Sequence, residues 1–150
     1  RYDALGKRYI YRVWNAAARN PFWEGRALHR RGRLDEAVLD QAAAAFIGRH
    51  DYAGFCAAGS AVEDTVRTVR RAQVAREGDM VLFTVEADGF LYHMVRIMAG
   101  TLLDIAAGRM AAEELPAVLA SCDRGRAGFT APACGLWLDR VFYPTEYGIS

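Results

Sequence analysis

The sequence predicts an α+β fold in which a mainly antiparallel sheet carries helices packed on one face. Three observations support this prediction. Segments that alternate with a period of two and are rich in aromatic and β-branched residues occur near both ends and in the middle of the chain. Segments with helical periodicity separate them. The two middle strands are joined by a short turn around Gly78, which is typical of an antiparallel hairpin.

The first strand is predicted over residues 7–14, where aromatic and β-branched residues alternate with a period of two. Its two faces consist of Tyr9, Tyr11 and Val13 on one side and of Arg8, Ile10, Arg12 and Trp14 on the other. Residues 15–33, which include Asn20-Pro21 and several arginines, are predicted to form a long loop. A loop of this length inside a compact domain is often functional.

Residues 34–47 are predicted to form an amphipathic helix. Asp35 and Glu36 lie in its first turn, where a negative charge interacts favourably with the helix dipole, and Gly48 ends it. Its apolar face consists of Val38, Leu39, Ala42, Ala45 and Phe46. We expect this face to pack on the sheet.

Residues 49–55 are predicted to form a turn that returns the chain to the core. His50 and Asp51 in this turn suggest either acid–base chemistry or local capping. Capping is favoured, because no Ser or Cys nucleophile motif accompanies them in the sequence. A surface loop and the two strands of the hairpin follow, over residues 57–64, 66–75 and 80–87.

The longest and most apolar helix is predicted between Gly89 and Gly108, with Gly108 at the position that commonly follows a helix C-terminus. The exceptions to its apolar surface fall in one narrow stripe, which consists of His93, Arg96, Gly100, Thr101 and Asp104. The stripe is either the solvent-facing edge of the helix or the lining of a site. Arg96 therefore extends to water, pairs with Asp104, or finds a carboxylate or phosphate partner in a site.

The last part of the chain is predicted to contain a short helix over residues 110–119 with an irregularity at Pro116, a flexible loop over 124–135 and a final strand over 136–143. The resulting order is strand, helix, two strands, two helices and strand. This topology is compatible with many functions, so the predicted fold alone indicates none.

At 150 residues the chain is predicted to form a single domain, residues 1–150, with room for a hydrophobic core. No run of uncharged apolar residues reaches the length of a membrane span, so no membrane association is expected. Three cysteines without metal-like spacing indicate a reducing cytoplasm and no metal site. The chain begins without Met, so we expect a piece of a longer protein. Its first residues carry charges but are not followed by the apolar region of a signal peptide.

The charge is unevenly distributed along the chain, although the net charge is only +1. Residues 1–33 carry nine Lys and Arg and two acids, a net charge of +7, whereas residues 34–66 carry one Arg and six acids, a net charge of −5. Clustered arginine is typical of a site for a polyanion such as nucleic acid. The alternative is a sequence that simply prefers Arg to Lys, since it contains a single Lys.

Several segments together resemble the tRNA pseudouridine synthase A family, in an order and spacing that extend over the whole chain: residues 1–11, 48–55, 66–69, 89–100 and 131–143. Phe-Leu-Tyr-His-Met-Val-Arg, residues 90–96, is the most specific of them. The resemblance covers only the C-terminal part of that family's catalytic chain. The N-terminal part carries an Arg-Thr-Asp motif with the essential Asp, and here Arg67-Thr68 is followed by Val69.

The resemblance implies half of the pseudouridine synthase fold and a C-terminal domain that works on a flipped-out base. Members of the family convert uridine to pseudouridine in the anticodon stem-loop of tRNA, around positions 38 to 40, with no metal or organic cofactor. They are typically homodimers. Because the nucleophilic Asp is not in this sequence, the resemblance implies that the isolated chain is catalytically inactive.

The family's motifs imply roles for individual residues. Tyr9 would stack on the target uracil and take part in proton transfer, and Arg96 would keep the absent Asp ionised. Leu136 would form an apolar wall of the substrate pocket, with Gly135 beside it. Contacts with tRNA phosphates are implied for Arg1, Lys7, Arg8, Arg12 and Arg67, and less directly for Arg30, Arg31 and Arg33. Arg70 and Arg71 belong either to this surface or to a solvated strand face.

Two other classes of function are compatible with the sequence. A noncatalytic RNA-binding module would use the same basic residues and would not need the Asp. A structural dimerisation domain would be built on the apolar helix at residues 89–108. The enzyme domain is favoured, because Tyr9, Arg96 and Leu136 make chemical sense as parts of one pocket.

Overall fold

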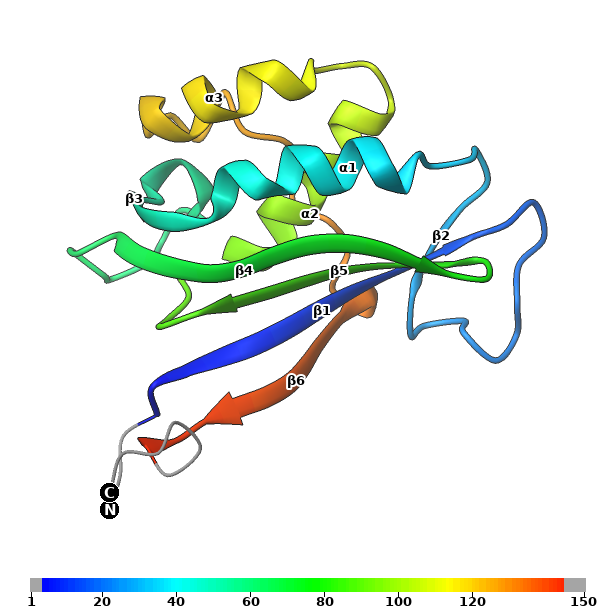
Figure 1. Ribbon diagram of the computed structural model, residues 1–150, viewed down its shortest axis with the longest axis horizontal. Helices are drawn as coiled ribbons and strands as arrows, with labels where there is room; N and C mark the ends of the chain where they lie inside the picture. The colour runs from blue at the N-terminus through cyan, green and yellow to red at the C-terminus, as the bar shows by residue number, and fades with distance from the viewer. Residues whose placement is uncertain (1–3, 145–150) are drawn as a thin grey trace.

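The computed structural model describes residues 4–144, in which one twisted sheet carries the helices on a single face (Figure 1). The strands are β1 (Gly6–Asn15), β2 (Leu28–Arg30), β3 (Gly48–Asp51), β4 (Val66–Glu77), β5 (Met80–Ala87) and β6 (Leu136–Phe142). The helices are α1 (Glu36–Ala43), α2 (Met94–Ala106) and α3 (Leu115–Ser121). Short 3₁₀ segments occur at Ala44–Phe46, Ala53–Phe55, Ala112–Glu114 and Ala133–Gly135. The predicted α+β class is confirmed.

The sheet is mainly antiparallel, as predicted. Its strand order is β2-β1-β5-β4-β3, and β6 also pairs with β1. β4 and β5 form the expected hairpin, whose turn contains Gly78 with a φ of +61°, a conformation that glycine adopts without strain. β1 runs antiparallel to both β5 and β6. The one parallel pair in the described part of the chain joins β1 to β2 at residues 13–15.

The hydrophobic core lies between the sheet and the helices. Side chains from β1, β4 and β5 contribute Tyr11, Val69 and Val85, which are almost completely buried. Ile97 and Met98 of α2 pack against them from the helical layer. Helix α2 is therefore a core helix, as its composition predicts, and none of the helices within residues 4–144 is long and apolar enough to cross a membrane.

Two predicted irregular segments contain short strands. The segment predicted as a loop over residues 15–33 includes β2, and the turn predicted over 49–55 begins with β3. Both predictions were wrong for the same physical reason. A strand of three or four residues has little periodicity of its own, and here its conformation follows from hydrogen bonding to β1 or β4.

Helix α1 is shorter than the predicted helix over 34–47. Asp35 precedes it as the N-cap, with its carboxylate accepting hydrogen bonds from the backbone N–H groups of Ala37 and Val38 at 3.1 and 3.3 Å. The end of the predicted helix is a 3₁₀ turn. Val38, assigned to the apolar face, is 42% exposed, whereas Ala43 is completely buried. The apolar stripe is thus rotated slightly from the predicted one.

The central helix starts later than predicted. Residues 90–93 form an irregular turn, in which the N–H of Met94 donates to the carbonyl of Leu91 at 3.1 Å. His93 has a left-handed backbone with a φ of 60°, so the helix can begin only after it. At the other end Gly108, with a φ of +79°, follows the helix as predicted. Pro116 is not an irregularity inside the short helix, because it occupies the first turn of α3, where proline is tolerated.

Candidate functional site

The start of α2 lies against the chain segment that leads into β6. The N–H of Ala131 donates to the carbonyl of Arg96 at 3.0 Å, and the Nε–H of Arg96 donates back to the carbonyl of Ala131 at 2.7 Å. This reciprocal pair joins residues that are far apart in the sequence. It holds the side chain of Arg96 against the segment at Ala131.

The polar stripe of α2 faces this same segment rather than solvent. A side chain on Gly100 would collide with the carbonyl oxygen of Phe129, so glycine allows the close approach. Thr101 is fully buried, and its hydroxyl accepts a hydrogen bond from the N–H of Gly128 at 2.9 Å. The solvent-edge alternative for the stripe is therefore wrong for these positions.

Tyr9, Arg96 and Leu136 line one hollow of about 180 Å³, although they come from β1, α2 and β6. The other lining residues, which are mostly apolar, are Phe90, Leu91, His93, Met94, Val95 and Ala133. The rings of Tyr9 and Phe90 meet edge to face at 5.0 Å between centroids. The hollow thus combines an aromatic ring, an aliphatic wall and one guanidinium group.

Gly135 does not line the hollow. It is buried against Tyr11, where an added side chain would come within 2.6 Å of the Tyr11 ring. Phe90 and His93 do line it; no role was predicted for Phe90, and His93 was predicted only as a member of the polar stripe of the helix. Their position inside the most specific matched segment, residues 90–96, was the signal that could have found them.

The terminal nitrogens of Arg96 have no protein partner within the described part of the chain. The side chain makes its one hydrogen bond there through Nε, and no carboxylate of residues 4–144 lies within ion-pair distance. The predicted alternative pair with Asp104 does not form, because Asp104 instead pairs with Arg109 at 3.2 Å. A half-buried guanidinium with an unpaired fork favours a carboxylate or phosphate that comes from outside these residues.

Tyr11 contacts the chain segment that borders this site. Its hydroxyl donates to the carbonyl of Pro132 at 2.6 Å. Burial raises the pKa of Tyr11 far above its usual range, so the phenol stays protonated and remains a hydrogen-bond donor. The side chains of Tyr11 and Leu136 share one face of the sheet, since the two residues are paired across β1 and β6.

The residues predicted to contact RNA are not equally available. Lys7 is exposed, whereas Arg8 forms ion pairs with Asp139 at 3.2 Å and with Glu86 at 3.5 Å. The guanidinium of Arg12 lies 4.3 Å from the ring centroid of Trp137. Arg67 donates from Nη1 to the carbonyls of Asp64 and Val66 at 2.8 Å. Arg1 lies outside the described residues.

The remaining basic residues predicted to contact RNA also differ in exposure and in pairing. Arg31 is exposed, and Arg33 pairs with Glu36 at 3.5 Å. Arg71 pairs with Glu86 at 3.2 Å, and Arg70 donates to the carbonyl of Leu5 at 3.3 Å. Arg30 is half-buried at the end of β2. A pair with a neighbouring acid reduces the charge that an arginine offers to a phosphate.

His50 and Asp51 have local structural roles. The ring Nε2 of His50 lies 3.0 Å from the carbonyl of Ile47. The carboxylate of Asp51 accepts hydrogen bonds from the hydroxyl of Thr65 at 2.6 Å and from the N–H of Ala53 at 3.0 Å. The hydrogen bond from Thr65 lowers the pKa of Asp51. These contacts agree with the capping interpretation and not with acid–base chemistry.

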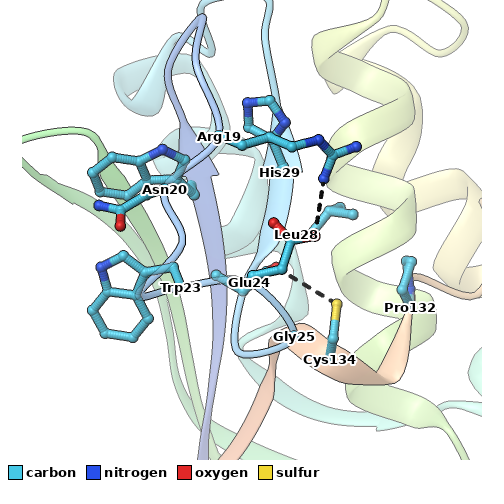
Figure 2. Close-up of a pocket in the computed structure, with 11 residues that line it drawn as sticks. Arg19, Asn20, Trp23, Glu24, Gly25, Leu28, His29, Pro132 and Cys134 are labelled. Carbon is cyan, nitrogen blue, oxygen red and sulfur yellow. Dashed lines mark hydrogen bonds and ion pairs between the residues drawn. The ribbon is translucent and has the colours of Figure 1, made fainter.

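A second hollow, of about 250 Å³, was not predicted as a site. It lies between the long segment after β1 and the segment at Pro132 and Cys134 (Figure 2). Arg19 and Glu24 form an ion pair of 3.4 Å in its lining, and the thiol of Cys134 lies 3.6 Å from the carbonyl of Ala27 (Figure 2). The length of the segment over residues 15–33 was the signal that pointed to this region.

The α+β fold and the first hollow together define a class of proteins by its site, in which an aromatic side chain, an aliphatic wall and a cation surround one cavity. The comparisons with known proteins make this class specific. The chain belongs to the tRNA pseudouridine synthase family, since the family model of that description matches residues 42–144.

Relatives described as tRNA pseudouridine synthase A match nearly the whole chain. The protein of Moorella thermoacetica is 47% identical over 143 residues, which is 95% of this chain and 58% of the relative. The protein of Halalkalibacterium halodurans is 46% identical over 136 residues, 91% of this chain and 52% of the relative. The protein of Acetivibrio thermocellus is 41% identical over 143 residues, 95% of this chain and 59% of the relative. The chain therefore spans little more than half the length of these relatives.

Proposed function

We propose that this chain is the C-terminal domain of a tRNA pseudouridine synthase and supplies one half of its active site. The observation that carries the proposal is the convergence of Tyr9, Arg96 and Leu136 on one hollow, with the terminal nitrogens of Arg96 unpaired within residues 4–144. The greater length of the relatives supports it, because a further segment can supply the partner of Arg96.

In the proposed reaction a uridine of the tRNA anticodon stem-loop, around positions 38 to 40, flips out of its stack and enters the hollow. The bond between N1 of the base and C1′ of the ribose breaks, and a bond between C5 and C1′ forms. The proton on C5 leaves and a proton is gained at N1, so the reaction is an isomerisation that needs no oxidant or reductant.

Each of the three residues has a defined part in this proposal. The ring of Tyr9 stacks on the uracil, and its hydroxyl takes part in the proton transfer. Leu136 covers the base from the strand side. The fork of Arg96 pairs with the Asp of the Arg-Thr-Asp motif and keeps that carboxylate ionised. That Asp lies outside this sequence, so the chain alone is inactive.

The proposed substrate surface consists of Lys7, Arg8, Arg12 and Arg67, together with Arg1. Their contacts would be to phosphates, which position the tRNA without reading its sequence. In the longer protein we expect a homodimer that works in the cytoplasm.

Noncatalytic RNA binding is the second candidate. It is favoured by the guanidinium of Arg12, which lies over the rings of Trp137 and Trp23 at 4.3 and 5.9 Å. Alternating arginine and aromatic groups form platforms on which single-stranded RNA stacks. A purely structural dimerisation domain would bind no tRNA.

The decisive experiment measures pseudouridine formation in unmodified tRNA by this chain alone and by this chain with an added N-terminal segment that carries Arg-Thr-Asp. We expect activity only in the mixture, and loss of that activity when the chain carries Arg96→Ala. Activity of the chain alone would contradict the proposal, because one of its own acids would then be the nucleophile. Salt-sensitive tRNA binding without activity in the mixture would favour the RNA-binding module.

A further inference from the structure

We propose that Tyr11 is a positioning residue for Arg96: its hydroxyl fixes the backbone segment whose carbonyl oxygen orients the Arg96 side chain. The catalytic consequence of this inference rests on the proposed function. Its structural part does not, because it concerns hydrogen bonds within this chain. We call residues 128–135 the bracing segment, since they pack against α2 and lead into β6 at the hollow.

The first step is the hydrogen bond that orients Arg96. The Nε–H of Arg96 donates a hydrogen bond to the carbonyl of Ala131 at 2.7 Å, and the backbone N–H of Ala131 donates to the carbonyl of Arg96 at 3.0 Å. Because a guanidinium is planar, fixing Nε sets the direction of both terminal nitrogens. The orientation of the two unpaired terminal nitrogens of Arg96 therefore depends on the position of the Ala131 carbonyl.

The second step is the anchor on the C-terminal side of Ala131. Pro132 follows directly, and its carbonyl accepts the hydroxyl of Tyr11 at 2.6 Å. Tyr11 is only 1% exposed and lies on β1, which is paired with β5 on one side and β6 on the other. Since the proline also restricts the backbone of Ala131, movement of Pro132 is transmitted to the Ala131 carbonyl.

Further anchors act on the N-terminal side of Ala131. Arg124 donates from Nη1 to the carbonyl of Gly128 at 2.7 Å and from Nη2 to the hydroxyl of Thr130 at 3.2 Å. The N–H of Gly128 donates to the hydroxyl oxygen of Thr101 on α2 at 2.9 Å. The bracing segment is thus held at both ends, and Tyr11 supplies the side-chain anchor next to the hollow.

The same anchor supports the opposite wall of the hollow. Leu136 follows the bracing segment and is paired with Tyr11 across β1 and β6. Gly135 packs against the Tyr11 ring without a side chain of its own. Removing the hydroxyl leaves this ring contact unchanged, so a Tyr11→Phe variant tests the hydrogen bond and not the packing.

Tyr52 provides a matched control. It is also completely buried, its hydroxyl also donates to a backbone carbonyl, that of Phe46, and burial also raises its pKa far above the usual range. It does not line the hollow. Tyr11→Phe and Tyr52→Phe therefore remove the same kind of hydrogen bond from the same kind of environment, and only one of them lies next to Arg96.

The first measurement is the rate at which the Nε–H proton of Arg96 exchanges with solvent, followed by ¹H–¹⁵N NMR of this chain and assigned by its disappearance in Arg96→Lys. We expect exchange in Tyr11→Phe to be about fivefold faster than in wild type, the effect of weakening one hydrogen bond, and unchanged in Tyr52→Phe. Equal exchange rates in the two variants would overturn the positioning role.

The second measurement is pseudouridine formation by the mixture with the Arg-Thr-Asp segment. Tyr11→Phe should lower the single-turnover rate about tenfold, because a small displacement of the Arg96 guanidinium from its productive orientation slows the reaction. The affinity for tRNA should be unchanged. Tyr52→Phe should turn over like wild type, and an equal loss in both variants would overturn the catalytic consequence. Absence of any product with the wild-type chain would reject the proposed function, while the exchange rates would still decide the positioning of Arg96.

Discussion

Two half-buried arginines, Arg96 at the hollow and Arg76 at the far end of β4, differ in how many of their guanidinium nitrogens have a hydrogen-bond partner. Arg76 donates to the Glu36 carboxylate at 2.9 Å, to Oδ1 of Asn15 at 2.7 Å and to the carbonyl of Leu34 at 2.9 Å. Arg96 makes one hydrogen bond, through Nε, within the described residues. A structural arginine is surrounded by acceptors from its own chain, whereas an arginine with an unpaired fork beside a hollow is available to a partner.

The largest expected effect comes from removing each of the two arginine side chains in turn and comparing the two variants. Arg96→Ala should lower pseudouridine formation in the mixture by more than about 10³-fold with only a modest loss of tRNA affinity, because the charge proposed to keep the Asp ionised is gone. Its free energy of unfolding should fall less than that of Arg76→Ala, because Arg96 makes one hydrogen bond within the described residues and Arg76 makes several. Arg76→Ala should instead destabilise the chain by roughly 2 kcal/mol and leave the hollow intact, because Asn15 and the Leu34 carbonyl lose a partner. Wild-type-like turnover in Arg96→Ala would remove the distinction between a catalytic Arg96 and a structural Arg76.

The hydroxyl of Tyr9 provides the next test of the hollow. Tyr9→Phe keeps the ring proposed to stack on the base and removes the group proposed for proton transfer, so turnover should fall by about 10²-fold with tRNA affinity unchanged. Tyr9→Ala, which also removes the ring, should in addition weaken binding. Normal turnover in Tyr9→Phe would restrict this residue to stacking.

Gly100 tests how closely the bracing segment must approach α2. Gly100→Ala should lower the free energy of unfolding by about 2 kcal/mol, because the new methyl group would overlap the Phe129 carbonyl. Gly32→Ala is the matched control, since nothing lies within 4 Å of a side chain added there and its stability should be nearly unchanged. Chemical denaturation of both variants makes the measurement, and equal stabilities would show that the segment can move away from the helix.

The smallest expected effect is on the stability of the chain at low pH. The hydrogen bond from Arg76 lowers the pKa of Glu36, so this carboxyl binds its proton more weakly in the folded than in the unfolded chain. Its stabilising contribution is present above the unfolded value of about 4.5 and is lost as the pH falls through the lower folded value. Glu36→Gln should therefore flatten the acid limb of a plot of denaturation midpoint against pH. An unaltered slope would mean that the ion pair contributes nothing measurable.

Much of the sheet could be predicted from the sequence, because its strands have local signals of their own. The hairpin strand β5 was predicted with its observed bounds, residues 80–87, and β1 extends the prediction by one residue at each end. Gly108 marks the end of α2 because its positive φ is a property of that single residue. β2 and β3 could not be predicted, since their conformation depends on pairing with strands distant in the chain.

The sequence by itself determined the α+β class, the amphipathic and apolar helices and, through matched motifs, the family and the candidates Tyr9, Arg96 and Leu136, because periodicity and motifs are encoded in neighbouring residues. Only the tertiary structure decided that these three line one hollow, that Asp104 pairs with Arg109 and that Gly135 packs against the Tyr11 ring. Those facts depend on distances between segments far apart in the chain. The partner of an arginine is set by which groups folding brings within a few ångströms of it, and no local pattern contains that information.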